Sequence, residues 1–208
     1  AHMTDLINRI LPRVQKPARY TGGEYNEIIK DKSQVEIRVA FCFPDTYEIG
    51  MSNVGMRILY GIMNNMEGVW CERAFAPWGD MEEEMRSHHL PLWTLESHDP
   101  LEEFDVIAFS LGYEMAYSNV LNMLELGNIP LKSCDRGDSL KHLVIAGGTS
   151  VYNPEPMADF LDICKKEVSH ERKTFIYPLI CGSGRLRPVL YFTAQLIRPV
   201  FYFDRIPF

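Results

Sequence analysis

Five residues able to contact a polar ligand stand close together after the first apolar run of the chain, in the segment PDTYEIGMS. They are Asp45, Tyr47, Glu48, Gly50 and Ser52. Carboxylates and hydroxyls at this density can bind polar groups, and the free amides of the helix after Ser52 can hold an anionic or amide group. Because ligands of open α/β sheets bind beyond the carboxyl ends of strands, we predict a binding site in this loop.

A second set of candidates follows two later apolar runs, 104–111 and 142–146, and comprises Ser110, Gly147, Gly148 and Thr149. We expect these residues to line the rest of the same site. Tyr113 and Glu114 come just after Ser110. The sequence leaves two interpretations open for these three polar residues: they line a ligand, or they cap the following helix.

The sequence predicts neither a catalytic residue nor a metal site. No Ser-His-Asp or Cys-His arrangement is supported by spacing, and no G-x-x-x-x-G-K-[ST] phosphate loop occurs. The pair His88-His89 with Glu82–Glu84 is interpreted as a solvated helix face. The five cysteines are scattered and lack a C-x-x-C pair, so a disulfide framework or a cysteine zinc site is not expected and a reduced, cytoplasmic setting is.

The elements that position these residues alternate between apolar runs and helical patterns. Extended runs are predicted at 35–43, 69–77, 104–111 and 142–146, and helices occupy most of the intervals between them. Near-continuous apolar strands separated by helices are typical of a parallel sheet buried on both faces. We therefore predict a doubly wound, flavodoxin-like α/β fold: a mostly parallel sheet of about five strands with helices on both faces.

Local signals give finer expectations within this frame. Ser52 is predicted to cap the helix that follows it, and Gly127 to end the helix over 114–126. Glu72 and Arg73 are interpreted as a surface pair on a packed strand.

Three segments divide the chain. Residues 1–34 hold a tag remnant (Ala1-His2-Met3), a short helix and a wrapping arm, residues 35–163 form the α/β domain, and residues 164–208 form a basic, aromatic tail. Residues 1–164 contain 13 Lys and Arg against 25 Asp and Glu, whereas residues 165–208 contain 8 against 3. An acidic body disfavours nucleic-acid binding by this domain alone. No apolar run approaches the roughly 20 residues that a membrane span needs.

The loop after the first strand, Asp45-x-Tyr47-x-x-Gly50, and the later Gly147-Gly148 resemble the D-x-H-x-x-G loop and Gly-Gly turn of cobalamin-binding Rossmann-like domains. Tyr47 stands where those domains have the histidine that binds cobalt. The resemblance therefore implies a corrinoid bound without a histidine lower ligand, since a phenol is a poor donor at neutral pH.

Several longer segments of the sequence resemble one group more closely, the uncharacterised radical SAM proteins with an N-terminal cobalamin-binding-like domain. These segments, which span roughly residues 16–162, are KPARYTGGEYN, FPDTYEIGMSNVGMRILY, ERAFAPW, PLWTLES, FDVIAFSLGYEMAYSNVLNML, IPL and IAGGTSVYNPEPMADF. The resemblance implies a partner, the radical SAM catalytic domain, normally in the same chain. The C-x-x-x-C-x-x-C triplet for the iron–sulfur cluster is absent here, so cluster and S-adenosylmethionine belong only to the full-length family and this chain is expected to be inactive alone.

Three functional hypotheses follow. The first is an accessory N-terminal domain of a radical SAM enzyme that carries a corrinoid. The second is a docking module without a cofactor, whose arm (residues 16–34) makes the contact. The third is a flavin or nucleotide binder on the same fold, with a ring stacked on Tyr47 or Tyr113.

Overall fold

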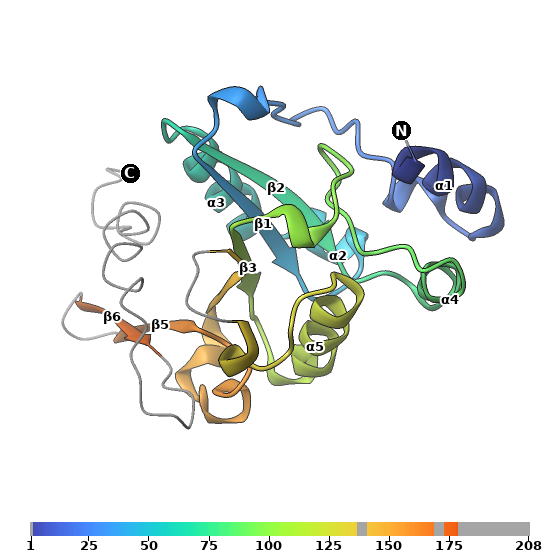
Figure 1. Cartoon of the computed structure of the whole chain (residues 1–208). Coiled ribbons are helices and arrows are strands. Elements are labelled where there is room, and N and C mark those ends of the chain that lie inside the picture. Colours follow the sequence, from blue (N-terminus) through green and yellow to red (C-terminus); the bar gives the residue numbers. More distant parts are fainter. Residues whose placement is uncertain (1, 137–140, 169–172, 179–208) are drawn as a thin grey trace.

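The computed structural model describes residues 2–136, 141–168 and 173–178, so most of the tail predicted at 164–208 lies outside the described residues (Figure 1). Among the described residues, no helix has the length and apolar content to cross a membrane. The helices and strands run in the order α1 (His2–Ile10), β1 (Ile37–Phe43), α2 (Tyr47–Ser52), α3 (Val54–Asn64), β2 (Val69–Phe75), α4 (Gly79–Ser87), β3 (Val106–Ser110), α5 (Tyr117–Leu126), β4 (Leu143–Gly147), β5 (Ile163–Val168) and β6 (Lys173–Pro178).

One sheet holds all six strands, in the order β2-β1-β3-β4-β5-β6. The first five strands pair in parallel, and β6 pairs antiparallel with β5. The order 2-1-3-4-5 is that of flavodoxin-like folds, and it reverses direction between β1 and β3. The predicted doubly wound, mostly parallel fold is confirmed.

Helices cover both faces of this sheet (Figure 1). Successive residues of a strand point to opposite faces, so β1 sends Val39 and Phe41 toward α3, and Ala40 and Cys42 toward the other face. The side chains that α3 contributes to the first core are Met56, Tyr60 and Met63. The second core contains buried side chains of α1, α4 and α5, namely Ile7, Ile10, Met81, Met85, Val120, Met123 and Leu124. Each large apolar side chain buried in this way contributes about 1.5–3 kcal/mol of transfer free energy.

The start of α3 differs from the expectation. Its capping residue is Asn53, whose side-chain oxygen accepts from the amide of Met56 at 2.9 Å. Ser52 instead ends α2, and its hydroxyl donates to the carbonyl of Ile49 at 2.8 Å. The prediction that Ser52 caps the helix is wrong because a short helix, α2, forms inside the loop and takes up Ser52. Gly127 does follow the last residue of α5, as predicted.

The part of the arm around Ile28 and Lys30 packs along the edge strand β2. The indole of Trp70 donates to the carbonyl of Ile28 at 2.9 Å, and the amide of Ile28 donates to the hydroxyl of Tyr60 at 2.9 Å. The ammonium of Lys30 donates to the carbonyl of Val69 at 2.5 Å. An uncovered edge strand is a template for unwanted pairing. On this edge Lys30 takes the carbonyl of Val69, Asn64 pairs with both backbone groups of Cys71, and the amide of Leu95 takes the carbonyl of Arg73.

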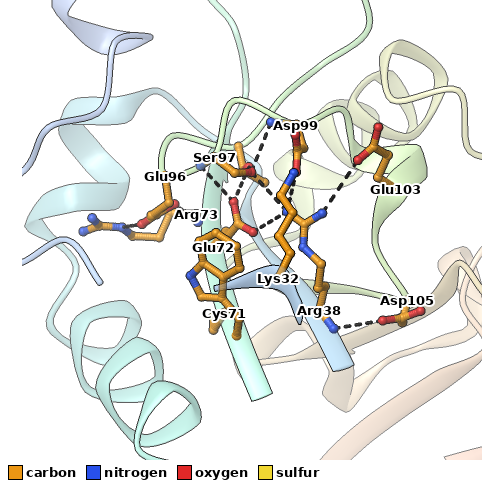
Figure 2. A network of polar contacts seen from close by, with 12 residues as sticks. Lys32, Arg38, Cys71, Glu72, Arg73, Glu96, Ser97, Asp99, Glu103 and Asp105 are labelled. Atoms are coloured by element: carbon orange, nitrogen blue, oxygen red, sulfur yellow. Dashed lines mark hydrogen bonds and ion pairs between the residues drawn. The ribbon is translucent and has the colours of Figure 1, made fainter. Parts of the chain in front are cut away.

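Both members of the pair Glu72 and Arg73 are buried, with 0% and 2% of their surface exposed, so the prediction of a surface pair is wrong. The arm and residues 94–99 cover the edge of β2, which a period-2 pattern does not reveal. The two side chains point to opposite faces of β2. Figure 2 shows that Glu72 joins a network containing Arg38, while Arg73 pairs with Glu96.

Candidate functional site

The loops after β1 and β3 meet where the strand order reverses. The hydroxyl of Tyr113 donates a hydrogen bond to Oδ2 of Asp45. The side-chain amide of Asn119, on α5, donates to the carbonyl of Pro44 at 3.0 Å. We call this end of the sheet, where the parallel strands finish, the carboxyl edge. Its first loop is held there by two contacts from the segment that follows β3.

The loops after β3 and β4 are joined in the same way. Ser110 and Gly147 are partners in the ladder between these strands, and the amide of Leu111 donates to the carbonyl of Gly147 at 2.7 Å. The hydroxyl of Thr149 donates to the carbonyl of Gly112 at 2.7 Å. Ser110, Gly147 and Thr149 therefore lie together at the carboxyl edge.

Gly148 is fixed by a close backbone approach. Its φ of +117° lies in the region that favours glycine, and a Cβ there would stand 2.3 Å from the carbonyl oxygen of Leu111. The segment after β4 can therefore pass directly over the end of β3 only because this residue has no side chain.

The side chain of Tyr47 points away from the residues gathered at the carboxyl edge and toward the arm. Its hydroxyl donates to Oε1 of Glu24, and its ring packs edge-on against Phe75 with centroids 5.5 Å apart. Burial, followed by the hydrogen bond to Glu24, raises the pKa of Tyr47 to about 12. The hydroxyl is thus a protonated donor already used inside the chain.

Glu48 also faces the arm. Its Oε1 accepts from Nε of Arg19 at 3.0 Å and from Nζ of Lys16 at 3.2 Å. A hydrogen bond from its own backbone amide, and next the one from Arg19, lower the pKa of Glu48 to about 2. Both polar side chains of the Tyr47-Glu48 pair therefore attach the arm to α2.

Gly50 and Ser52 are used in the packing and hydrogen bonding of α2. A Cβ on Gly50 would stand 2.2 Å from the ring of Phe75, so this glycine lets α2 pack on the end of β2. The hydroxyl of Ser52 is used within α2. The nine predicted site residues thus divide: Asp45, Ser110, Gly147, Gly148 and Thr149 gather at the carboxyl edge, whereas Tyr47, Glu48, Gly50 and Ser52 serve α2 and the arm.

Two further residues contribute to the carboxyl edge: Tyr113, which the sequence left open as ligand-lining or helix-capping, and Asn119, which it did not single out. Tyr113 precedes the 3-10 turn Glu114–Ala116, but its side chain makes no capping bond and reaches across to Asp45. The helix-capping interpretation of Tyr113 is therefore wrong. The available signal was its position immediately after a strongly buried strand.

The loops at the carboxyl edge expose large apolar side chains beside polar ones such as Glu114, Thr149 and Asn153. Five large apolar residues, each 45–86% exposed, come from the segments that follow β1, β2, β3 and β4: Ile49, Trp78, Tyr113, Met115 and Tyr152. Within residues 2–136, 141–168 and 173–178, no group of three or more His, Cys, Asp and Glu could hold a metal ion. The carboxyl edge therefore offers large apolar side chains for packing, above polar groups such as Asp45 and Thr149 that are hydrogen-bonded within the protein.

Comparisons with known proteins place the chain in a family. No curated protein and no solved structure matches it. Residues 55–166 match the family described as radical SAM proteins, N-terminal. The matched segment runs from the start of α3 to the middle of β5 and so contains four of the five parallel strands, in whole or in part. Because it covers more than half of the 208 residues, the protein belongs to this family of N-terminal regions of radical SAM proteins.

Proposed function

We propose that this chain is the accessory N-terminal domain of a radical SAM iron–sulfur enzyme in the cytoplasm, and that its carboxyl edge docks against the catalytic domain of the same protein. The observation that carries the proposal is that the segments after β1, β2, β3 and β4 each expose at least one large apolar side chain. Exposed apolar side chains that a partner domain can cover are typical of an interaction site. Family membership supplies the partner, since these regions occur in radical SAM proteins.

The polar groups of the carboxyl edge are hydrogen-bonded to one another, and this favours docking of a partner domain over binding of a polar ligand. Asp45 accepts from Tyr113, and the Thr149 hydroxyl donates to a backbone carbonyl. A polar ligand would have to displace these contacts, whereas an apolar partner surface would leave them intact. The arm, which the docking hypothesis proposed as the contact, is attached to α2 and β2 through much of its polar chemistry. We therefore place the docking face at the carboxyl edge.

The test compares amide hydrogen exchange in this chain with exchange in the full-length protein that includes the radical SAM domain. Docking at the carboxyl edge is expected to protect segments 45–53, 112–116 and 149–153 in the longer protein. Met115→Asp should remove that protection, because it places a charge in the proposed interface. Ile58→Asp is the matched control, since Ile58 is also exposed but lies on α3. Unchanged exchange in all three segments would refute the proposal.

Corrinoid binding is a second candidate function. It is favoured by the flavodoxin-like strand order and by Gly148, which has no side chain to cover its backbone. Tyr47 does not fit a lower cobalt ligand, because its hydroxyl is committed to Glu24 and its pKa is raised to about 12. A corrinoid would have to bind at the carboxyl edge without a ligand from this loop. Iron–sulfur cluster and S-adenosylmethionine would be held by the catalytic domain, not by this chain.

Titration with hydroxocobalamin, followed by visible absorbance and tryptophan fluorescence, tests this second candidate. Saturable binding without the spectrum of histidine ligation, weakened by Gly148→Ala, would support it. No binding at high micromolar concentrations would exclude it for the isolated chain. A flavin spectrum in the purified protein would support the flavin alternative instead.

A further inference from the structure

A buried arginine on the edge strand has donors that the chain leaves unused. Arg73 is 2% exposed and lies on β2. Its Nε donates to Oε1 of Glu96 at 2.7 Å, and its backbone amide donates to Oε2 at 2.6 Å (Figure 2). Glu96 therefore neutralises the guanidinium through its Nε side. The two terminal nitrogens point away from this carboxylate.

Of the two terminal nitrogens, Nη1 has weak partners and Nη2 has none among the described residues. Nη2 is buried and has no hydrogen-bond partner among the described residues. Nη1 donates to Oδ1 of Asn26 at a long 3.4 Å and to the sulfur of Met51 at 3.5 Å, and a thioether sulfur is only a weak acceptor. Buried polar groups are nearly always hydrogen-bonded, so an orphaned guanidinium nitrogen calls for an explanation such as a bound ion or ligand.

The environment suits one kind of ligand. The guanidinium lies over the ring of Tyr60, with Cζ 4.4 Å from the ring centroid, and this stacking fixes its plane. The paired terminal nitrogens of an arginine match the two oxygens of a carboxylate, which they bind by parallel hydrogen bonds. A carboxylate here would complete the donors that Glu96 leaves free.

The side chains of Asn26 and Met51 lie over the terminal nitrogens of Arg73, and both can move. Asn26 comes from the arm and is exposed, and Met51 lies near the end of α2 and is half-buried. Methionine has three rotatable side-chain bonds and repacks easily. A small molecule can therefore reach the guanidinium by displacing two side chains.

We propose that Arg73, beneath Asn26 and Met51, is a binding site for the carboxylate group of a small molecule. The site lies between the arm, which contributes Asn26, and α2, which contributes Met51. It is separate from the docking face at the carboxyl edge, and neither proposal depends on the other.

Formate is the probe for the first test. The melting temperature of the whole chain is measured against formate concentration, with sodium chloride at equal ionic strength as the reference. Saturable stabilisation by formate over chloride is expected. It should vanish in the double variant Arg73→Met with Glu96→Gln, which removes both buried charges and keeps an acceptor for the amide of residue 73. Equal formate effects in both proteins, or none in the wild type, would overturn the proposal and leave a water molecule as the partner of Nη2.

A second variant builds the ligand into the chain. Asn26→Asp places a carboxylate at the position 3.4 Å from Nη1, so the melting temperature at pH 7 should rise by about 2–4 °C and the response to formate should disappear. The gain should be lost as pH falls below about 4, where the new carboxyl becomes protonated. Asn153→Asp, the same change in the loop after β4, should leave the formate response intact. An Asn26→Asp protein that keeps its full formate response would contradict the proposal.

Discussion

The Tyr113 hydroxyl donates to the Asp45 carboxylate, and this single contact joins two segments 68 residues apart at the point where the sheet reverses its strand order. In flavodoxin-like folds that point separates the two halves of the sheet. The contact therefore holds together the loops from which a ligand or a partner domain would have to be bound.

Removal of this contact should loosen the loop more than it destabilises the fold. Tyr113→Phe keeps the ring and deletes the donor, and since Tyr113 is 45% exposed the loss should be about 0.5–1.5 kcal/mol. Amide exchange in segment 44–46 should accelerate, as read by mass spectrometry. Tyr25→Phe, at a fully exposed tyrosine of the arm, is the control and should change neither quantity. Unaltered exchange in Tyr113→Phe would mean that Asn119 alone holds the loop.

Gly148 and Gly61 should respond to alanine in opposite directions. A Cβ at Gly148 meets a backbone oxygen at 2.3 Å and the residue has φ +117°, so Gly148→Ala should cost at least about 2 kcal/mol. A Cβ at Gly61, inside α3, meets nothing within 4 Å, so Gly61→Ala should stabilise the protein by about 0.5–1 kcal/mol. Urea unfolding measures both. A neutral Gly148→Ala would show that the segment after β4 can move away from Leu111.

The doubly wound, mostly parallel fold could be predicted from the sequence because strand burial and helix periodicity are local signals. The apolar runs that become β1 and β3, and the glycine that follows α5, needed no knowledge of tertiary contacts. Asp45 and Thr149 were also predictable as residues of the carboxyl edge, because parallel strands end at the same side of a sheet.

What the sequence did not reveal depends on segments that meet only in three dimensions. Tyr47 and Asp45 are two residues apart, yet one contacts the arm and the other the loop after β3. Nothing in PDTYEIG indicates that α2 turns Tyr47 away. Glu72 and Arg73 look like surface residues because charged residues are rarely buried, and only the arm and residues 94–99 bury them.

The network around Glu72 should be sensitive at its buried end and tolerant at its exposed end (Figure 2). Glu72 is fully buried and accepts from Arg38 at 2.5 Å, from the hydroxyl of Thr94 at 2.8 Å and from the amide of Ser97 at 3.0 Å. Glu72→Leu should cost about 3–5 kcal/mol, because the amide of Ser97 loses its acceptor and Arg38 loses its fully buried partner, keeping only Asp99 and Glu103. Glu103→Gln, at a half-exposed ion pair of 3.7 Å with the same arginine, should cost less than about 1 kcal/mol. Similar losses in urea unfolding would contradict the assignment of Glu72 as the centre of the network.

The protonated phenol of Tyr47 should stabilise the folded protein, and this stabilisation should be lost at alkaline pH. Its pKa is raised to about 12 in the folded protein, against about 10 in an unfolded chain. The native state therefore favours the protonated phenol, and this contribution is complete below pH 10 and lost as pH rises from 10 to 12. Tyr47→Phe should be less stable than the wild type at pH 9, and the difference should narrow toward pH 12 in urea unfolding. A difference that is constant with pH would argue that the phenol titrates normally.

Attachment of the arm should depend on Gly22 more than on its neighbour Gly23. Both residues have positive φ, +64° and +79°, so alanine strains the backbone at either position, by about 1 kcal/mol. Only at Gly22 would the new Cβ also collide, at 2.2 Å, with the carbonyl oxygen of Leu95. Gly22→Ala should therefore lift the arm from β2 and speed cleavage by trypsin after Arg19 and Lys30, whereas Gly23→Ala should be cut at nearly the wild-type rate. Equal cleavage of the two variants would mean that Tyr60, Trp70 and Lys30 hold the arm without the close approach at Gly22.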